Sequence, residues 1–295
     1  MIFGKKDHLV GLDIGSSFIK VAELKVTGNG YALSKFGYTR IAPGTIVEGR
    51  VIDMAGLAND IRLLFKSQKI REKNVAISTG GHSVVIKTIN TSTKAGKELQ
   101  DTIYSEAEQY IPYDIDDVNI DYQVLGESDF SPEQINILLV AVKKDLVAEY
   151  IDLIHMAGLN PKIIDVDTFA LQNVYEILPY ENREKITLLI DVGASKTSLN
   201  ILKANASLMM RDTVSGTNQI IEEICDQFDV TVDEAEQALN GEANDIVRPD
   251  KIQEISLRIS QSWCSEICEV VNTYQSSTND EKVEKIVLSG GGAFV

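Results

Sequence analysis

The chain has 295 residues, of which 44% are hydrophobic, and its formal net charge is −16 at pH 7. A chain of this length can bury a large core, and we expect two lobes rather than one. The acidic excess argues against nucleic acid as a partner, because nucleic-acid binders usually carry a basic face. No apolar run approaches the roughly 18 residues of a membrane span, and the first ten residues lack the apolar segment of a secretory signal. Three cysteines without metal-like spacing favour a reduced, cytoplasmic protein.

The first predicted elements in chain order are strands and one helix. Two β-rich runs are joined by Gly15, Ser16 and Ser17, a combination that predicts a hairpin. Apolar residues at positions 57, 61, 64 and 65 have the spacing of a helix. The expected order is strands at residues 9–14, 18–24 and 31–41, a helix within 51–70, and a strand at 74–79.

Residues 82–166 then form a pattern of their own. Their predicted order is β-α-β-β-α-β, which fits a small sheet with helices on one face and therefore an independent inserted subdomain. The expected elements are a strand at 83–89, a helix at 97–111, strands at 118–125 and 135–142 with a loop at 127–134 between them, a helix at 144–158 and a strand at 162–167.

The start of the chain is repeated further along, after a predicted helix at residues 168–178. Residues 12–17 (LDIGSS) align with residues 190–195 (IDVGAS), so that Asp13 and Asp191 lie 178 residues apart. Each copy continues into a second strand, a further β-type segment and an amphipathic helix. A repeat at this distance predicts two homologous halves that face each other. A long helix at 251–275 and a strand at 285–289 precede Gly290, Gly291 and Gly292.

The two Asp-x-Gly hairpins have the chemistry of a phosphate site. A glycine at the tip lets the backbone approach a ligand, and successive N–H groups in a turn form an anion-binding concavity. Asp13 and Asp191 end their strands just before the turns, where a carboxylate can hold Mg²⁺ through water. One copy alone is better explained as a tight hairpin turn, whereas two copies favour one polyphosphate held from two sides. Further donors are the hydroxyls of Ser16, Ser17, Ser195 and Thr197 and the ammonium of Lys20.

Three segments resemble motifs of the superfamily that contains actin, heat-shock chaperones and sugar kinases. DIGSSFIK (13–20), IDVGASKT (190–197) and LSGGGA (288–293) resemble its phosphate-1, phosphate-2 and adenosine motifs, in the same order. Residues 41–53, 107–126 and 155–171 further resemble the PilM family of type IV pilus assembly, and the resemblance extends over nearly the whole chain. The cell-division protein FtsA, which carries a similarly placed insert, is the nearest relative of that family.

This resemblance implies an α/β fold of the duplicated actin-like (ribonuclease H-like) type. Two lobes would surround a nucleotide cleft, and an FtsA-like subdomain 1C would be inserted in the first. The expected division is residues 1–81, completed by 167–183, as the first half (1A); residues 82–166 as subdomain 1C; and residues 184–295 as the second half (2A), with a small 2B-like segment at about 225–250.

The resemblance also implies which residues bind ATP and Mg²⁺. Asp13 and Asp191 match the aspartates that hold Mg²⁺ through water, and Glu236 matches a glutamate that contacts the ribose. Two features depart from the family pattern: Leu239 stands where relatives often have a lysine, and the helix and strand that follow the triple glycine in relatives are not present in this sequence. The first phosphate loop is Gly15, Ser16, Ser17 and Lys20; the second is Gly193, Ala194, Ser195 and Thr197; the adenosine loop is Gly290, Gly291 and Gly292.

The function implied by the resemblance is that of an ATP-binding scaffold in pilus assembly. Such proteins are cytoplasmic and lie at the inner face of the cytoplasmic membrane, held indirectly by the short N-terminal peptide of a PilN-like partner. Nucleotide state would be coupled to binding of this peptide, in a groove within residues 82–166. Candidate groove residues are Tyr104, Tyr110, Ile111 and Tyr113, although a place in the hydrophobic core explains them better.

Two alternatives remain open at this stage. One is a phosphotransferase of the same superfamily, and the other is an FtsA-like membrane adaptor that forms filaments. No segment supplies a residue that would position water against the γ-phosphate, so we expect slow ATP hydrolysis or none and assign no catalytic residue. Self-association is also left open.

Overall fold

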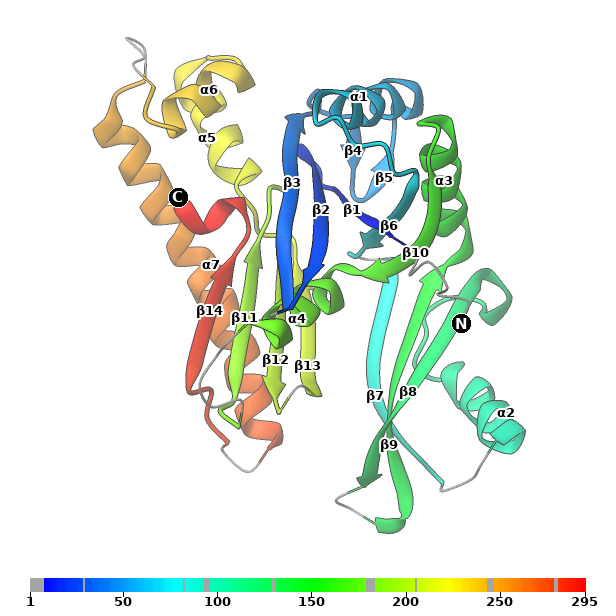
Figure 1. Cartoon of the computed structure of the whole chain (residues 1–295). Coiled ribbons are helices and arrows are strands. Elements are labelled where there is room, and N and C mark those ends of the chain that lie inside the picture. The colour runs from blue at the N-terminus through cyan, green and yellow to red at the C-terminus, as the bar shows by residue number, and fades with distance from the viewer. Residues whose placement is uncertain are drawn as a thin grey trace. The chain divides into compact units, whose positions relative to one another are not determined.

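The computed structural model describes residues 8–28, 30–81, 83–92, 96–128, 131–178, 184–204, 206–242, 247–278 and 281–295. The chain divides into two compact units, Met1–Ala170 and Leu171–Val295. In Figure 1 the first unit runs from blue to green and the second from green to red. Each unit is built on a sheet that begins with an antiparallel hairpin.

The first unit contains a five-stranded mixed sheet. Its three N-terminal strands are antiparallel, and two later strands extend the sheet in parallel from the first strand. The sheet order is β10 (Asn160–Val166), β6 (Asn74–Thr79), β1 (Val10–Ile14), β2 (Phe18–Thr27) and β3 (Gly30–Arg40), and a small hairpin of β4 (Ile46–Val47) and β5 (Arg50–Val51) follows β3.

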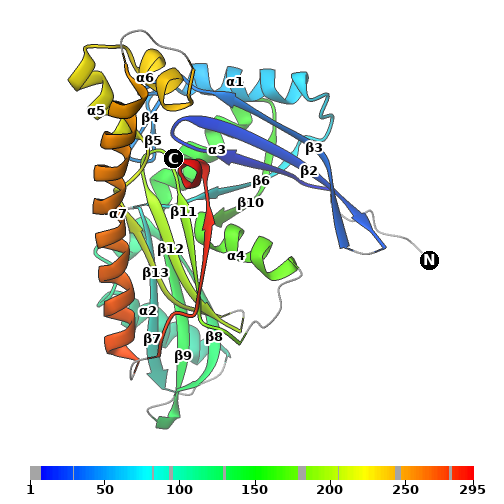
Figure 2. The same cartoon turned by 90° about the vertical axis from the view of Figure 1, so that its left-hand side faces the viewer.

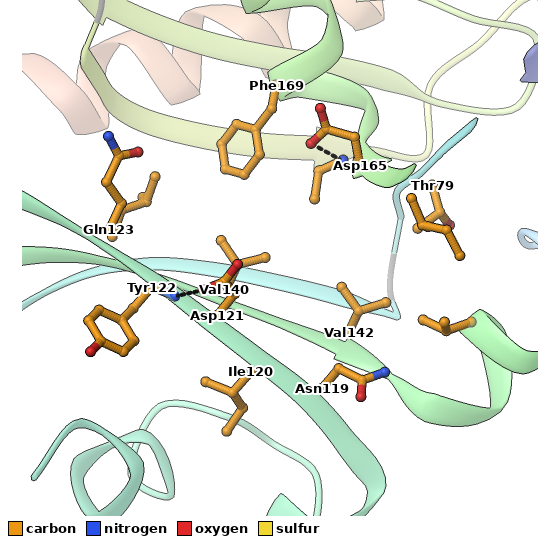
Figure 3. A pocket seen from close by; sticks show the side chains of 14 residues that line it. Thr79, Asn119, Ile120, Asp121, Tyr122, Gln123, Val140, Val142, Asp165 and Phe169 are labelled. Carbon is orange, nitrogen blue, oxygen red and sulfur yellow. Dashed lines mark hydrogen bonds between the residues drawn. The ribbon is translucent and has the colours of Figure 1, made fainter. Parts of the chain in front are cut away.

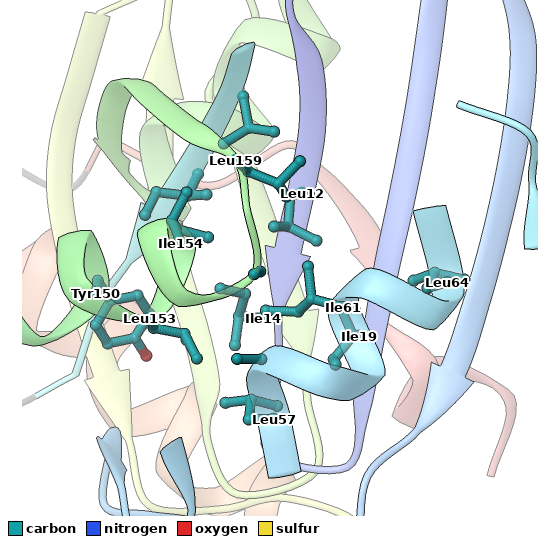
Figure 4. Close-up of a cluster of buried hydrophobic side chains, with 14 of the residues drawn as sticks. Leu12, Ile14, Ile19, Leu57, Ile61, Leu64, Tyr150, Leu153, Ile154 and Leu159 are labelled. Carbon is teal, nitrogen blue, oxygen red and sulfur yellow. The ribbon is translucent and has the colours of Figure 1, made fainter. Parts of the chain in front are cut away.

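The core of this unit lies between the sheet and two helices, α1 (Met54–Ser67) and α3 (Lys144–Met156) (Figure 4). Burial alternates along β1, so Leu12 and Ile14 point to the helices, where they meet Ile61 of α1 and Leu153 of α3. Each fully buried side chain of this kind stabilises the fold by about 1.5–3 kcal/mol. The Asp53 side chain caps α1 by accepting the N–H of Gly56 at 2.9 Å.

A second, three-stranded antiparallel sheet also belongs to the first unit. Its order is β7 (Val84–Ser92), β9 (Ser131–Lys143) and β8 (Val118–Ser128), and α2 (Gly96–Ala107) covers one of its faces. Ile103 of α2 packs there with Ile137 and Leu139 of β9. The opposite face carries alternate residues of β8 and β9, among them Asp121 and Val140, which are paired in the ladder.

The predicted insert differs from the structure in three ways. The strand expected to complete the small sheet, β10, instead pairs in parallel with β6, and α3 packs with α1, so the inserted sheet ends at Lys143 and not at residue 166. Parallel partners are joined through a crossover helix and are distant in sequence, so local pattern cannot identify them. The loop expected at 127–134 is shorter, because β8 reaches Ser128 and β9 begins at Ser131. Helix α2 ends at Ala107, and Ile111 follows it in a turn.

The second unit contains a four-stranded sheet covered on both faces. Its order is β13 (Ala206–Thr213), β12 (Thr197–Lys203), β11 (Thr187–Val192) and β14 (Lys285–Ser289), with β14 parallel to β11. One face packs with α5 (Asn218–Phe228), α6 (Val232–Leu239) and α7 (Pro249–Ser277), and Figure 2 shows α7 running along this sheet. On the other face Tyr175 of α4 (Asp167–Ile177) packs with Leu189 and Leu202. In the part of the chain that the structure describes, no helix is long and apolar enough to span a membrane.

The two sheets have equivalent topology, which confirms the predicted internal repeat. Strands β1, β2, β3 and β6 have the same neighbours and directions as β11, β12, β13 and β14. Even the register agrees: Asp13 lies opposite Lys20, and Asp191 lies opposite Ser198, at the same offset in the sequence. The sequence similarity around the two aspartates therefore reflects duplication of the whole sheet motif.

Candidate functional site

The turn of the first hairpin keeps two backbone amides available. The Gly15 N–H closes the turn by donating to the carbonyl of Phe18 at 3.0 Å, and the carbonyl of Ser17 accepts from Ile41 at 3.0 Å. The amides of Ser16 and Ser17, by contrast, donate no hydrogen bond within the described residues. Two adjacent free N–H groups at the tip of a turn suit an anionic ligand.

An ion pair lies beside this turn. Lys20 Nζ is 2.7 Å from Asp13 Oδ2, and both side chains are about half exposed. An exposed pair of this kind contributes at most about 1 kcal/mol, so a polyphosphate with its cation can compete for either partner. The predicted phosphate-binding lysine and the predicted Mg²⁺-binding aspartate are thus direct neighbours.

The second hairpin is held by the start of α5. Its Gly193 N–H donates to the Lys196 carbonyl at 2.9 Å, as Gly15 does in the first copy. The carbonyls of Gly193 and Ala194 accept from Thr217 at 3.1 Å and from Asn218 at 2.9 Å. A Cβ on Gly216 would lie only 2.3 Å from the Ala194 oxygen, so this position requires glycine. We had not predicted Gly216, although a glycine just before an amphipathic helix was a usable signal.

Helix α7 supports the same region from behind. The Ser215 hydroxyl donates to the Glu266 carboxylate, and Trp263 Nε1 donates to Gln219 Oε1 at 2.6 Å. Both acceptor–donor pairs join α7 to the segment that begins α5. The long helix therefore fixes the position of the second turn, a role that its sequence pattern did not reveal.

The triple-glycine turn packs directly on the end of β11. Gly290 has φ of 86°, and a Cβ there would lie 2.3 Å from the Val192 carbonyl oxygen and 2.7 Å from Asp191 Oδ1. A Cβ on Gly292 would lie 2.4 Å from Val192 Cγ1, whereas one on Gly291 would meet nothing within 4 Å. The structure thus brings Asp191 together with the adenosine-type loop.

Two further predicted residues, Thr197 and Glu236, lie away from the two turns' exposed backbone amides. Thr197 is 2% exposed and its hydroxyl donates to the Ser215 carbonyl at 2.7 Å, so in this structure the hydroxyl is engaged within the unit. The reason is the duplication: Thr197 occupies the position of Ile19, which faces the core. Glu236 lies half-buried on α6, in the helical layer of the unit and not on the strand ends that carry Asp191.

The donors of both turns fit a polyphosphate with a hard cation. Each turn offers backbone N–H groups or hydroxyls, including the exposed Ser195, and each follows a strand that ends in an aspartate. Mg²⁺ keeps several waters and is usually held by one or two carboxylates together with phosphates. Asp13 and Asp191 supply such carboxylates, and the glycines supply close backbone approach.

A separate pocket lies within the first unit (Figure 3). Its volume is about 360 Å³, and it is formed between the face of the three-stranded sheet opposite α2 and the end of β10 with the first turn of α4. Asp121 and Val140 line it from the sheet, and Asp165 and Phe169 line it from the opposite side. The full lining is Thr79, Asn119, Ile120, Asp121, Tyr122, Gln123, Leu138, Val140, Val142, Val147, Ile164, Asp165, Val166 and Phe169.

The groove residues predicted from sequence do not line this pocket. Ile111 is 5% exposed and belongs to the core between α2 and the sheet, and Tyr113 lies under Lys143 Nζ at 4.1 Å from the ring centroid. Tyr104 and Tyr110 are exposed on α2 and the turn after it. Sequence alternation could not identify the residues that line the pocket, because both faces of the sheet carry apolar residues and only the tertiary structure shows which face α2 covers.

The duplicated sheet, with a phosphate-type turn at the start of each copy, defines an actin-like fold. A sequence model described as "Type IV pilus assembly protein PilM" matches residues 11–295. The chain belongs to the PilM family of type IV pilus assembly proteins.

Solved structures agree with this assignment. A "PilM-PilN type IV pilus biogenesis complex" superposes with a TM-score of 0.86 at 25% identity, covering 97% of this chain and 82% of that chain. The ethanolamine utilization protein EutJ of Carboxydothermus hydrogenoformans gives a TM-score of 0.58 at 14% identity, with 99% and 79% covered. MreB5 of Spiroplasma citri bound to AMPPNP gives 0.53 at 13% identity, with 99% and 87% covered. The last two share the fold.

Proposed function

We propose that this chain is an ATP-binding, actin-like scaffold of the type IV pilus machine that binds the N-terminal peptide of a PilN-like partner. The observation that carries this proposal is the PilM family match over residues 11–295, together with the similarity to a solved PilM–PilN complex. It favours a scaffold over a phosphotransferase or an FtsA-like adaptor. The partner would hold the protein at the inner face of the cytoplasmic membrane.

The pocket of the first unit is the proposed peptide site. It combines an apolar surface, formed by Val140, Val142 and Phe169, with a few polar side chains at its margin. A short extended peptide binds such a surface by inserting alternate apolar side chains as anchors. Because the pocket is formed by the inserted sheet and the first sheet together, the peptide would bridge these two parts of the unit.

The two hairpin turns are the proposed ATP site. The amides of Ser16 and Ser17, with Lys20 and the second turn, would bind the phosphates, and the loop at Gly290 would approach the adenosine. When bound, Mg²⁺ would neutralise phosphate charge, and Asp13 and Asp191 would orient its water ligands. We expect slow hydrolysis or none.

Helix α4 is the proposed link between the two sites. Phe169, in its first turn, lines the peptide pocket. One turn further, Gln172 Oε1 accepts hydrogen bonds from Asn200 at 3.2 Å and Ser207 at 2.5 Å. Asn200 lies on β12, the strand that leaves the second phosphate turn. A peptide that shifts the start of α4 would therefore act on the strand behind that turn.

Calorimetric titration tests both sites in one series. We expect Mg²⁺–ATP to bind with micromolar or tighter affinity, and Asp13→Ala and Asp191→Ala each to weaken it at least about tenfold, since one carboxylate of the cation's surroundings is lost. Asp101→Ala, on the exposed side of α2, is the matched control. Unchanged affinity in both site variants would refute the two-turn site.

The second arm titrates a synthetic peptide of about the first fifteen residues of the PilN protein from the same organism. Phe169→Ala removes an aromatic wall of the pocket, and we expect it to weaken binding by about tenfold or more. Tyr104→Ala removes an exposed aromatic from α2 and should leave binding unchanged. If Tyr104→Ala weakened peptide binding and Phe169→Ala did not, the peptide would bind on the α2 side of the sheet.

A further inference from the structure

The peptide pocket is acidic as well as apolar. Of its lining residues, two are carboxylates, Asp121 and Asp165, and none is a lysine, arginine or histidine. The two carboxylates come from opposite sides of the pocket, Asp121 from β8 and Asp165 from the end of β10 (Figure 3). An occupant placed between them meets a negative charge on each side.

Both carboxylates retain an oxygen for a ligand. Asp121 Oδ1 accepts the N–H of Tyr122 at 2.8 Å, and Asp165 Oδ1 accepts the N–H of Val166 at 2.8 Å. These local bonds fix the orientation of each side chain. Within the described residues neither carboxylate forms an ion pair, so the pocket supplies its charge without a cation of its own.

The apolar surroundings determine which kind of cation fits. Phe169 and Val140 lie beside the carboxylates, and the aliphatic stem of a lysine or arginine can cover such side chains while its charged head reaches an oxygen. An arginine head can also stack on the Phe169 ring.

We propose that this pocket selects a peptide in which a lysine or arginine is flanked by apolar residues, and that Asp165 and Asp121 receive its charge. The inference rests on the proposed peptide-binding function and adds its selectivity. Asp165 is half-buried and Asp121 is exposed, so Asp165 contributes more, because solvent and salt screen it less. The negative pocket also attracts the peptide from solution, so its association rate falls as salt rises.

The test compares two N-terminally acetylated PilN peptides, one natural and one with arginine replaced by citrulline and lysine by norleucine. Acetylation removes the α-amine as a source of positive charge. With the parent protein we expect the neutral peptide to bind about tenfold more weakly. Asp165→Asn should weaken the natural peptide about three- to tenfold and Asp121→Asn about twofold, and the double variant should bind both peptides equally. The side-chain oxygen of asparagine can still accept the hydrogen bond from the next backbone N–H, so we expect each variant to fold.

The control variant is Asp101→Asn, which makes the same change in net charge on exposed α2. It should preserve the preference for the natural peptide. Equal binding of the two peptides to the parent, or an equal loss in Asp101→Asn, would overturn the charge selection while leaving the peptide site intact. If neither peptide binds the parent protein, the proposed function itself fails.

Discussion

The glycines of the last turn show at the scale of single residues how close packing defines the site. Gly290 combines a left-handed φ of 86° with a place so close to the end of β11 that an added Cβ would lie 2.3 Å from the Val192 carbonyl oxygen. Neighbouring Gly291 meets nothing where its Cβ would lie. Only the first of these two glycines is therefore required by the structure beside Asp191.

Gly290→Ala should consequently disrupt the turn, whereas Gly291→Ala should not. The added Cβ would meet the Val192 carbonyl at 2.3 Å in a backbone conformation that alanine avoids, so the turn must move. We expect the free energy of unfolding to fall by about 1–3 kcal/mol and ATP affinity to decrease at least about tenfold. Urea unfolding and calorimetry measure the two effects. If Gly290→Ala and Gly291→Ala had the same free energy of unfolding and the same ATP affinity, the close packing of Gly290 on β11 would be contradicted.

Strands β2 and β3 illustrate, at the scale of elements, how a buried charge joins two parts of a sheet. Glu23 is 8% exposed, and its carboxylate lies 3.0 Å from Lys35 Nζ and 3.2 Å from His8 Nε2. The hydrogen bond from Lys35 lowers the pKa of Glu23 below its ordinary value, burial acts in the opposite direction, and His8 adds to the lowering. The ion pair between Glu23 and Lys35 stabilises the hairpin of β2 and β3 only while Glu23 is ionised.

Lowering the pH should therefore weaken the contacts of the Glu23 carboxylate with Lys35 and His8. Because the pKa of Glu23 is lower in the folded than in the unfolded chain, its contribution is complete above the unfolded pKa and is lost as the pH falls through the folded value. Glu23→Gln should lower the free energy of unfolding by about 1 kcal/mol at pH 7. Between about pH 5 and pH 3 this free energy should then fall less in the variant than in the parent. Urea unfolding across this range, with exposed Glu108→Gln as control, measures the difference. If the free energy of unfolding fell with pH by the same amount in Glu23→Gln and in the parent, Glu23 would make no pH-dependent contribution to stability.

At the scale of the whole molecule, α4 is the element shared by the two units. Its first turn belongs to the first unit and carries Phe169, and its later turns belong to the second and carry Gln172 and Tyr175. Tyr175 is buried, with its hydroxyl 3.3 Å from Thr187 Oγ1 on β11. Tyr175 also packs with Leu189 and Leu202, whereas Gln172 is joined to β12 and β13 by hydrogen bonds, which have discrete geometries and can be exchanged when a helix shifts.

The proposed link predicts reciprocal effects of ATP and peptide. We expect ATP to change peptide affinity about fivefold or more, and the peptide to change ATP affinity by the same factor, as linkage requires. Gln172→Ala removes the acceptor of Asn200 and Ser207 and should bring this factor towards one, while Asn173→Ala, exposed on the same helix, should not. Titration of each ligand with and without the other gives the factor. If ATP and peptide changed each other's affinity by the same factor in Gln172→Ala as in the parent, the two sites would not be coupled through Gln172.

Patterns within short stretches were sufficient for much of the fold. The Asp-x-Gly hairpins, the helical spacing of α1 and the long helix α7 all follow from neighbouring residues, and the repeat relating Asp13 to Asp191 predicted two equivalent sheets. The family resemblance through the three glycine motifs agrees with the family match. These features are local, or they are copied with the duplicated segment, so one sequence is enough to find them.

By itself, then, the sequence determined the duplicated actin-like fold, the family and the residues at both turns, because hairpins and amphipathic helices arise from contacts close in the chain. Only the tertiary structure decided that β10 joins the first sheet, that Thr197 faces the core as Ile19 does, and that Gly216 holds the second turn. The pocket between Asp121 and Asp165 was decided there as well. Each of these depends on which distant segment covers which face, a choice that residue alternation leaves undetermined.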